Sequence, residues 1–283
     1  MIQRLKPKSE FSRNVLTLMT GTTIAQAIPI AISPILTRMY TPEDFGLLAL
    51  FLALFSILST IATGRYELAI MSPESDDEAK DIVFLSILVA IFVFFIATIL
   101  IWFFGAEIAF FLGNSEIKNW LYFIPFTVLS FGVYQSIDYW LNRQKKYRGM
   151  SENKLIQVGS VSILQLIIGV FSKSGLILGS ICGWISSMFV VFSRSKIKYS
   201  DFRLKESKKA LLKYKDYPLF QAPSSVLNSI AEQSPVIFIS RSFLDSTVGF
   251  FSLVLKTLNA PVTLISKSIG QVYFQRVSEH ANS

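Results

Sequence analysis

A lysine stands in the middle of an apolar segment close to the end of the chain. Residues 250–267 read FFSLVLKTLNAPVTLISK, and Lys256 lies well inside them. In the centre of a bilayer a lysine ammonium costs roughly 2.5–3.5 kcal/mol even on the mildest scale, so Lys256 requires water or a partner. Two roles fit this position: an ion pair with Glu232, or a fixed positive charge for an anionic cargo in a cavity.

Polar side chains at helical spacing point to such a cavity. Gln26 lies in the first of the long apolar segments, Asn228 and Glu232 are four residues apart in the seventh, and Asn259 follows Lys256 in the eighth. Residues three or four apart share one face of a helix. Amide and charged groups in hydrocarbon demand water or a partner, whereas serine and threonine more often serve helix packing. We therefore expect these five residues to line a wet cavity between helices.

Further charges lie near the ends of apolar segments. Asp138 is close to the basic residues 143–148, so it forms either a salt bridge at the membrane surface or a carboxylate that couples transport to a proton or another ion. Glu232 is the second candidate for ion coupling. Arg38 and Arg241 stand at the C-terminal ends of the first and seventh apolar segments, on the side away from the basic loops. There a guanidinium reaches lipid headgroups or holds a phosphate.

The composition places these residues in an all-α integral membrane protein. Of 283 residues, 52% are hydrophobic and 16% are charged, far less charge than a soluble domain of this length carries. A membrane-spanning helix needs about 20 mostly apolar residues. Eight segments fit this requirement: residues 15–37, 45–66, 82–104, 119–140, 154–171, 174–193, 217–240 and 247–268. The single cysteine, Cys182, and the single histidine, His280, exclude a disulfide framework and a Cys/His metal site, and no cofactor is expected.

Basic residues divide unequally between the two sides of these segments. With the N-terminus inside, the inside loops hold 20 Lys and Arg residues and the outside loops hold four. Cytoplasmic loops carry such an excess, so we expect a cytoplasmic N-terminus. The formal net charge of +8 is therefore a sign of topology, and it requires no nucleic-acid partner.

An internal repeat divides the chain into two lobes. TRMYTPEDFGLLAL (37–50) and SRSFLDSTVGFFSL (240–253) align without gaps at an offset of 203 residues, which pairs Gly46 with Gly249. Such repeats are typical of transporter halves, and these two run in the same direction. The sequence predicts a six-helix lobe over residues 1–193, a basic cytoplasmic linker over 194–216, and the first two helices of a second lobe over 217–283.

Three smaller features predict packing. Residues 82–104 are apolar all round and should face lipid broadly. Residues 174–193 carry Gly175, Gly179 and Gly183 at intervals of four, followed by Ser187, which is typical of a close helix contact. Arg65 and Glu67 end the second segment and are interpreted as an interfacial ion pair.

Four stretches resemble a known family: ILTRMYTPEDFGLLALF, GRYELAIM, YPLFQAPSSVLN and GFFSLVLKTLNAPVTLISKSIGQVYFQR. They look like the polysaccharide transporter family, the O-antigen and lipopolysaccharide flippases of the multidrug/oligosaccharidyl-lipid/polysaccharide exporter superfamily. The resemblance implies two six-helix lobes around a V-shaped cavity, alternating access, and location in the bacterial inner membrane. It implies an oligosaccharide on undecaprenyl pyrophosphate as cargo, with membrane lipids, a polysaccharide polymerase and chain-length proteins as partners.

Because two helices of the second lobe are present, we expect a truncated or interrupted chain. Three alternatives stay open beside the flippase: a drug or metabolite antiporter of the same superfamily, a membrane enzyme, and a non-functional remnant. An antiporter for cations would favour acidic residues, whereas the deepest charge here is Lys256. An enzyme needs acid and base residues in a sizeable site outside the membrane, and the longest outside loop, 105–118, offers little beyond Glu107 and Glu116.

Overall fold

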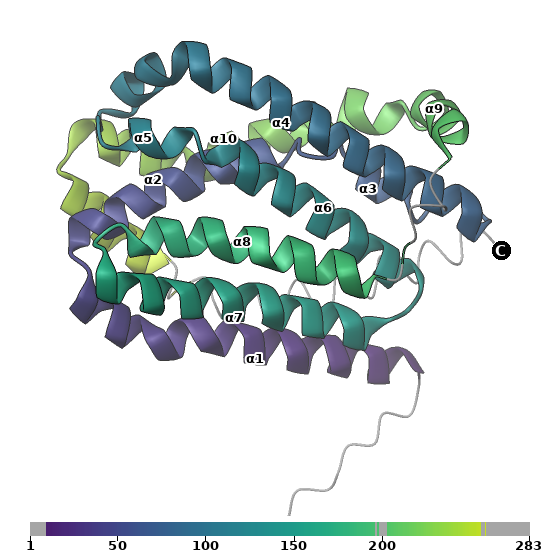
Figure 1. The fold of residues 1–283 in the computed structure, drawn as a ribbon, viewed down its shortest axis with the longest axis horizontal. Helices are drawn as coiled ribbons and strands as arrows, with labels where there is room; N and C mark the ends of the chain where they lie inside the picture. The colour runs from purple at the N-terminus through teal and green to yellow at the C-terminus, as the bar shows by residue number, and fades with distance from the viewer. Residues whose placement is uncertain (1–9, 196, 198–202, 256–257, 259–283) are drawn as a thin grey trace, which may run out of the picture.

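The computed structural model describes residues 10–195, 197, 203–255 and 258. Long helices lie side by side in it, and the described residues include no strand (Figure 1). The longest helices are α1 (Glu10–Met39), α2 (Pro42–Ser59), α4 (Asp76–Leu112), α6 (Ile124–Arg143), α7 (Tyr147–Phe171), α8 (Gly175–Arg194) and α10 (Ala222–Ser242). Shorter elements join them: α3 (Tyr66–Ala69), α5 (Ile117–Leu121), α9 (Leu204–Lys213) and the π-helix η2 (Tyr217–Gln221).

The predicted class, an all-α integral membrane protein, is confirmed. Five helical stretches are long and apolar enough to cross a membrane: Pro42–Ser59, Asp76–Leu112, Ile117–Arg143, Tyr147–Phe171 and Gly175–Arg194. Helices α1 and α10 have spanning length but a more polar composition, and a helix over Asp245–Leu255 begins the eighth predicted segment.

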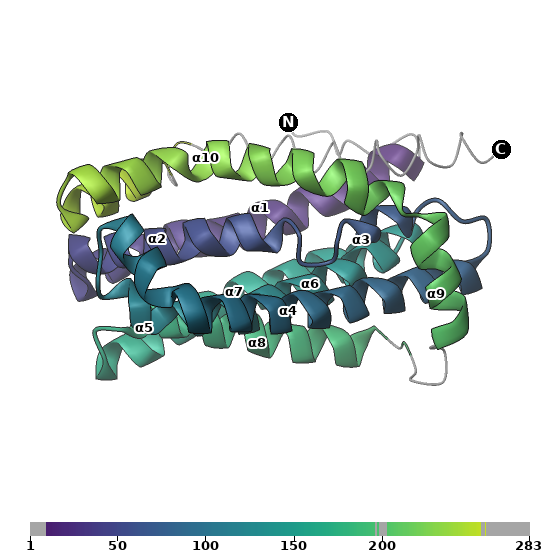
Figure 2. The same ribbon diagram turned by 90° about the horizontal axis from the view of Figure 1, so that it is seen from above.

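The described residues form a bundle and a hairpin, and the molecule has two distinct ends. The first bundle comprises α1 to α8, and the second hairpin comprises α10 and the helix Asp245–Leu255. The basic end of the molecule carries α9 and the 143–148 turn, and the far end carries α5 and the turns after Met39, Phe171 and Ser242 (Figure 1). Helix α10 runs along one side of the first bundle (Figure 2).

Helix α4 is the longest of the described helices, and its sequence shows why it begins at Asp76. Ser75 caps the helix by accepting a hydrogen bond from the Glu78 amide at 3.3 Å, and Asp76, Asp77 and Glu78 fill the first turn, where carboxylates favour the helix dipole. Its 37 residues span about 55 Å, more than the hydrocarbon core of a bilayer. Its middle and final turns expose large apolar side chains, in line with the broad lipid face that the sequence predicts: Phe92, Phe95, Ile99, Trp102, Phe103, Phe104, Phe110 and Phe111.

The α7–α8 pair is held by glycine, as predicted. A Cβ on Gly179 would come within 2.5 Å of the Gln165 amide nitrogen, and one on Gly183 within 2.5 Å of the Val161 Cα. The side-chain amide of Gln165 donates to the Leu176 carbonyl at 3.1 Å and to the Ser180 hydroxyl at 2.9 Å. This polar residue is therefore satisfied inside a spanning helix, which accounts for its place in α7.

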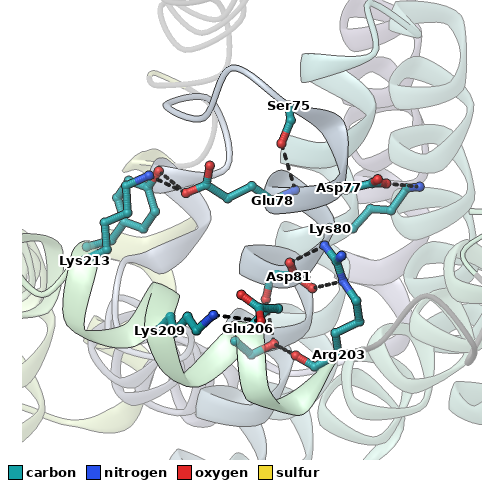
Figure 3. Close-up of polar contacts among 11 residues, drawn as sticks. Ser75, Asp77, Glu78, Lys80, Asp81, Arg203, Glu206, Lys209 and Lys213 are labelled. Atoms are coloured by element: carbon teal, nitrogen blue, oxygen red, sulfur yellow. Dashed lines mark hydrogen bonds and ion pairs between the residues drawn. The ribbon is translucent and has the colours of Figure 1, made fainter.

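The basic linker carries a helix docked on the acidic start of α4 (Figure 3). The Arg203 guanidinium binds both carboxylate oxygens of Asp81, at 2.7 and 3.2 Å, and Lys213 pairs with Glu78 at 2.5 Å. The hydrogen bond to Glu78 raises the pKa of Lys213 above its ordinary value. The acidic run before the third predicted segment thus has a structural partner, α9, that lies more than 120 residues further along the chain.

The two repeats meet each other at the far end. A Cβ on Gly46 would collide with the carbonyl oxygen of Asp245, and a Cβ on Gly249 would collide with that of Pro42. The offset of 203 relates both pairs, since Pro42 corresponds to Asp245 and Gly46 to Gly249. The contact is therefore reciprocal, as expected for two equivalent hairpins around an axis parallel to their helices.

Candidate functional site

Two polar cavities lie on either side of α6, and both are bordered by Phe131 and Gln135. The α1/α7 cavity, about 470 Å³, lies between α1, α6 and α7 and is lined by Thr22, Gln26, Tyr134, Asp138, Ser151 and Lys154 among others. The α2/α10 cavity, about 440 Å³, lies between the first bundle and the second hairpin and is lined by Ser56, Ser59, Thr60, Arg65, Ser225, Asn228, Ser229 and Glu232. The shared residues make Gln135 the centre of one polar region.

The structure sorts the predicted cavity residues into two groups around this centre. Gln26 lines the α1/α7 cavity, and Asn228 and Glu232 line the α2/α10 cavity. Both cavities thus draw on the polar faces that the helical spacing predicted. Lys256 and Asn259 lie outside the described residues, so the pairing of Lys256 with Glu232 stays a prediction.

Asp138 faces the α1/α7 cavity, and the basic residues near it in sequence have other partners. Arg143 pairs with Asp76 at 3.0 Å, and Arg148 pairs with Glu152 at 3.0 Å. Within the described residues Asp138 has no ion pair within 4.0 Å. The surface salt bridge, one of the two readings of Asp138, is therefore not formed in this structure.

Glu67 is a buried carboxylate that sequence reasoning placed at the membrane surface. Its side chain is 1% exposed and pairs with Arg65 at 3.4 Å, so the predicted pair is confirmed but its setting is internal. The Thr63 hydroxyl donates to one carboxylate oxygen, and the Gln135 amide donates to the other at 3.2 Å. The short spacing of Thr63, Arg65 and Glu67 at the end of a polar stripe is the signal that could have marked this cluster.

An unusual backbone turn holds Arg65 in place. Gly64 and Arg65 have φ angles of 58° and 64°, in the left-handed region that costs a non-glycine residue about 1–2 kcal/mol. This turn lets the Arg65 guanidinium bind Glu67 on one side and the hydroxyl of Ser225, on α10, at 2.6 Å on the other. The strained residue thus links the first bundle to the second hairpin.

Three buried polar atoms at these cavities have no hydrogen-bond partner among the described residues: Gln26 Oε1, Arg65 Nε and Ser229 Oγ. Gln26 lines the α1/α7 cavity, and the other two line the α2/α10 cavity. Buried polar groups in folded proteins nearly always have a partner, which can be water or a ligand. The polar region is therefore suited to receive a hydrated or hydroxyl-rich group.

A family model described as "Polysaccharide biosynthesis protein" matches residues 35–283, which include the whole lining of the α2/α10 cavity and the α6 and α7 walls of the α1/α7 cavity. The chain belongs to this family. No curated protein and no solved structure matches the chain. Family and fold together define an integral membrane protein of polysaccharide biosynthesis.

At the far end of this polysaccharide biosynthesis protein, the two predicted arginines differ. The Arg241 guanidinium lies over the Phe111 ring, 5.4 Å from its centroid, and the neighbouring Ser240 hydroxyl donates to the Leu112 carbonyl at 2.9 Å. Arg38 is exposed at the end of α1. Arg241 is thus part of the contact between the second hairpin and α4, away from both cavities.

Proposed function

We propose that this family member moves an oligosaccharide linked to undecaprenyl pyrophosphate, such as an O-antigen unit, across the bacterial inner membrane by alternating access. The observation that carries the proposal is the polar region around Gln135, which joins the two cavities, while large apolar side chains are exposed on the outer helices. A glycan needs hydrogen-bond partners to replace water during passage, and amide and hydroxyl groups supply them. Family membership connects that passage to polysaccharide synthesis.

Each cavity side chain takes a role in this proposal. Asn228 and Gln135 bind sugar hydroxyls, and Gln26 does so in the second cavity. Arg65, whose side chain is 23% exposed, faces the α2/α10 cavity and offers charge to the pyrophosphate, a role also proposed for Lys256.

Coupling to a proton or another ion falls to the cavity carboxylates. Asp138 lines the α1/α7 cavity and Glu232 lines the α2/α10 cavity. The protein then acts as a transporter without chemistry of its own, next to membrane lipids, a polymerase and chain-length proteins.

Transport can be tested with the whole chain in liposomes that contain a lipid-linked oligosaccharide. The assay follows how fast the glycan becomes accessible to an added glycosidase. Asn228→Phe fills the α2/α10 cavity and should abolish transport, whereas the neighbouring Leu227→Phe, at a residue that is 69% exposed and does not line the cavity, should leave it unchanged. Equal rates with and without protein, equal rates in both variants, or transport of a cationic drug in place of the glycan would overturn the proposal.

The proposal places the basic end in the cytoplasm, and Cys182 makes this simple to test because it is the single cysteine. In a Cys182→Ser background, Lys118→Cys on α5 should react with an impermeant maleimide in intact cells. Lys209→Cys on α9 should react after permeabilisation alone. The reverse pattern would invert the topology.

A further inference from the structure

A third pocket lies at the basic end, where α7 begins and α8 ends. This α7–α8 pocket, about 360 Å³, shares no lining residue with either central cavity. Leu141 and Val191 form its apolar floor, and Lys146, Arg148, Glu152 and Arg194 supply charge. None of these residues belongs to the proposed transport path, so the pocket calls for a function of its own.

Positive charge exceeds negative charge in this pocket. Arg148 contacts one oxygen of the Glu152 carboxylate at 3.0 Å, and Arg194 contacts the other at 2.5 Å. One carboxylate therefore fixes two guanidinium groups that come from different helices. With Lys146 the lining holds three cations and one anion, which leaves an excess of two positive charges for a ligand.

The first turn of α7 adds neutral donors on the same side. No side chain caps this helix, and the amides of Arg148 and Gly149 lie in its first turn, where the helix itself supplies no acceptor. The positive end of the helix dipole favours an anion at this place.

Asn153 provides an independent sign of a ligand. Its side chain lines the pocket and is 3% exposed, yet it makes no hydrogen bond with any described residue. The amide atoms of Asn153 keep some access to the pocket, where they can take a partner. Its NH₂ group is suited to donate to an oxygen of an anion held by the two arginines.

We propose that the α7–α8 pocket binds a phosphate group. Guanidinium groups bind phosphate through two parallel hydrogen bonds, and the amide donors complete a set directed at oxygen. The pocket sits at the ends of two spanning helices, and exposed Phe189 and Phe192 lie on α8 within a turn or so of Arg194. An anionic phospholipid fits this setting, with its headgroup in the pocket and an acyl chain along α8. A free phosphate compound has the same headgroup chemistry.

Two arms of one experiment distinguish these sources. The whole chain is placed in nanodiscs of phosphatidylcholine, and binding is followed by thermal stability as either phosphatidylglycerol or soluble glycerol phosphate is added. A lipid site predicts a rise in melting temperature with phosphatidylglycerol alone. A rise with glycerol phosphate as well identifies a site for free phosphate compounds. No rise in either arm overturns the proposal.

Variants locate the effect in the pocket. The double change Arg148→Gln and Arg194→Gln should weaken apparent phosphate affinity about tenfold or more, because both bidentate partners are lost. Lys208→Gln with Lys215→Gln removes the same charge from exposed linker positions and should leave affinity unchanged. If the control loses as much phosphate affinity, binding depends on overall charge, and the proposal that the pocket binds phosphate is overturned.

Asn153→Asp keeps the proposal testable if the arginine variant does not fold. It preserves side-chain size and the ion pairs of Glu152 with Arg148 and Arg194, but it places a carboxylate against the phosphate. Binding should fall several-fold while the unliganded melting temperature changes little. Wild-type affinity in folded Asn153→Asp protein contradicts the assigned role of the pocket.

Discussion

The first bundle and the second hairpin meet in two different ways at the two ends of the molecule. At the far end the backbones of α2 and the helix Asp245–Leu255 touch at Gly46 and Gly249, with no side chain between them, and Ser240 and Arg241 contact α4 beside this junction. At the basic end the contact is a side-chain hydrogen bond from Arg65 to Ser225 at 2.6 Å, and next to it Ser72 is hydrogen-bonded to Tyr217, in the η2 turn that leads into α10, at 2.9 Å.

The difference has a consequence for motion. Dispersion contacts between close backbones lose roughly a quarter to a half of their attraction when a gap of about 0.5–1 Å opens. Side-chain hydrogen bonds are exchanged for bonds to water at a small net cost. We infer that the basic end opens more readily and that the far end acts as the pivot, with the α2/α10 cavity between them.

The largest expected effect comes from Glu67→Ala, which removes the carboxylate that holds Arg65 at the basic end. Glu67→Ala leaves the Arg65 guanidinium without its carboxylate and the Thr63 and Gln135 donors without an acceptor. Loss of one partner from a buried ion pair costs about 3–5 kcal/mol. Unfolding in detergent should show this loss, while Glu43→Ala, an exposed acid on α2, should change little. A Glu67→Ala protein as stable as the control would show that the cluster does not support the junction.

The next largest effect is a loss of stability caused by a substitution at the far end. Gly46→Ala places a methyl group against the Asp245 carbonyl, which belongs to backbone and cannot rotate away. Overpacking of this kind costs about 1–3 kcal/mol. Gly159→Ala is the matched control, because a Cβ there has no heavy atom within 4 Å, and it should be neutral or stabilising. Equal stability of the two variants would remove the case for a tight pivot.

A smaller effect on stability is expected from a substitution at the basic end, and it is compared with the effect on transport rate. Ser225→Ala removes the hydrogen bond from Arg65 to α10 and should cost about 1 kcal/mol, since water can take the place of the hydroxyl. If the basic end opens during transport, this change should alter the rate of glycan transport more than stability. Ser224→Ala, at an exposed neighbouring position, should affect neither quantity. An unchanged rate in Ser225→Ala would separate this contact from gating.

The smallest effect concerns α9. Lys213→Gln removes the exposed ion pair with Glu78, and such pairs contribute little and weaken with salt. Limited proteolysis of the 194–216 segment should be faster in this variant at low salt and equal to the wild type at high salt. Lys215→Gln, an exposed lysine near the end of the same segment, should cleave as the wild type does at every salt concentration. The same acceleration in both variants would mean that docking of α9 does not depend on Glu78.

Local sequence patterns predicted the helices, the lipid face of α4 and the glycine contact of α7 with α8, because each depends on spacing within one segment. The repeat was found from an offset, and the structure adds that the two aligned glycines touch. The same spacing correctly grouped Asn228 with Glu232 on one cavity wall.

Local sequence patterns could not predict which polar residues of different helices bind each other. The burial of Glu67 depends on Gln135, 68 residues later, and Arg143 binds Asp76, 67 residues earlier, instead of nearby Asp138. Neither choice follows from helical spacing, because each is set by how separate helices pack. The docking of α9 on α4 belongs to the same class, since opposite charge alone does not select Asp81 over its acidic neighbours.

The reciprocal contact of Gly46 and Gly249 also bears on the ancestry of the chain. Gly46 contacts Asp245, and Gly249 contacts Pro42, which is the equivalent of Asp245 in the first repeat. Two identical subunits form the same kind of reciprocal contact across a two-fold axis. Gene duplication followed by fusion turns such a homodimer contact into one inside a single polypeptide. In a single polypeptide each of the two glycines has its own codon, so a change on one side of such a contact leaves the other side as it was.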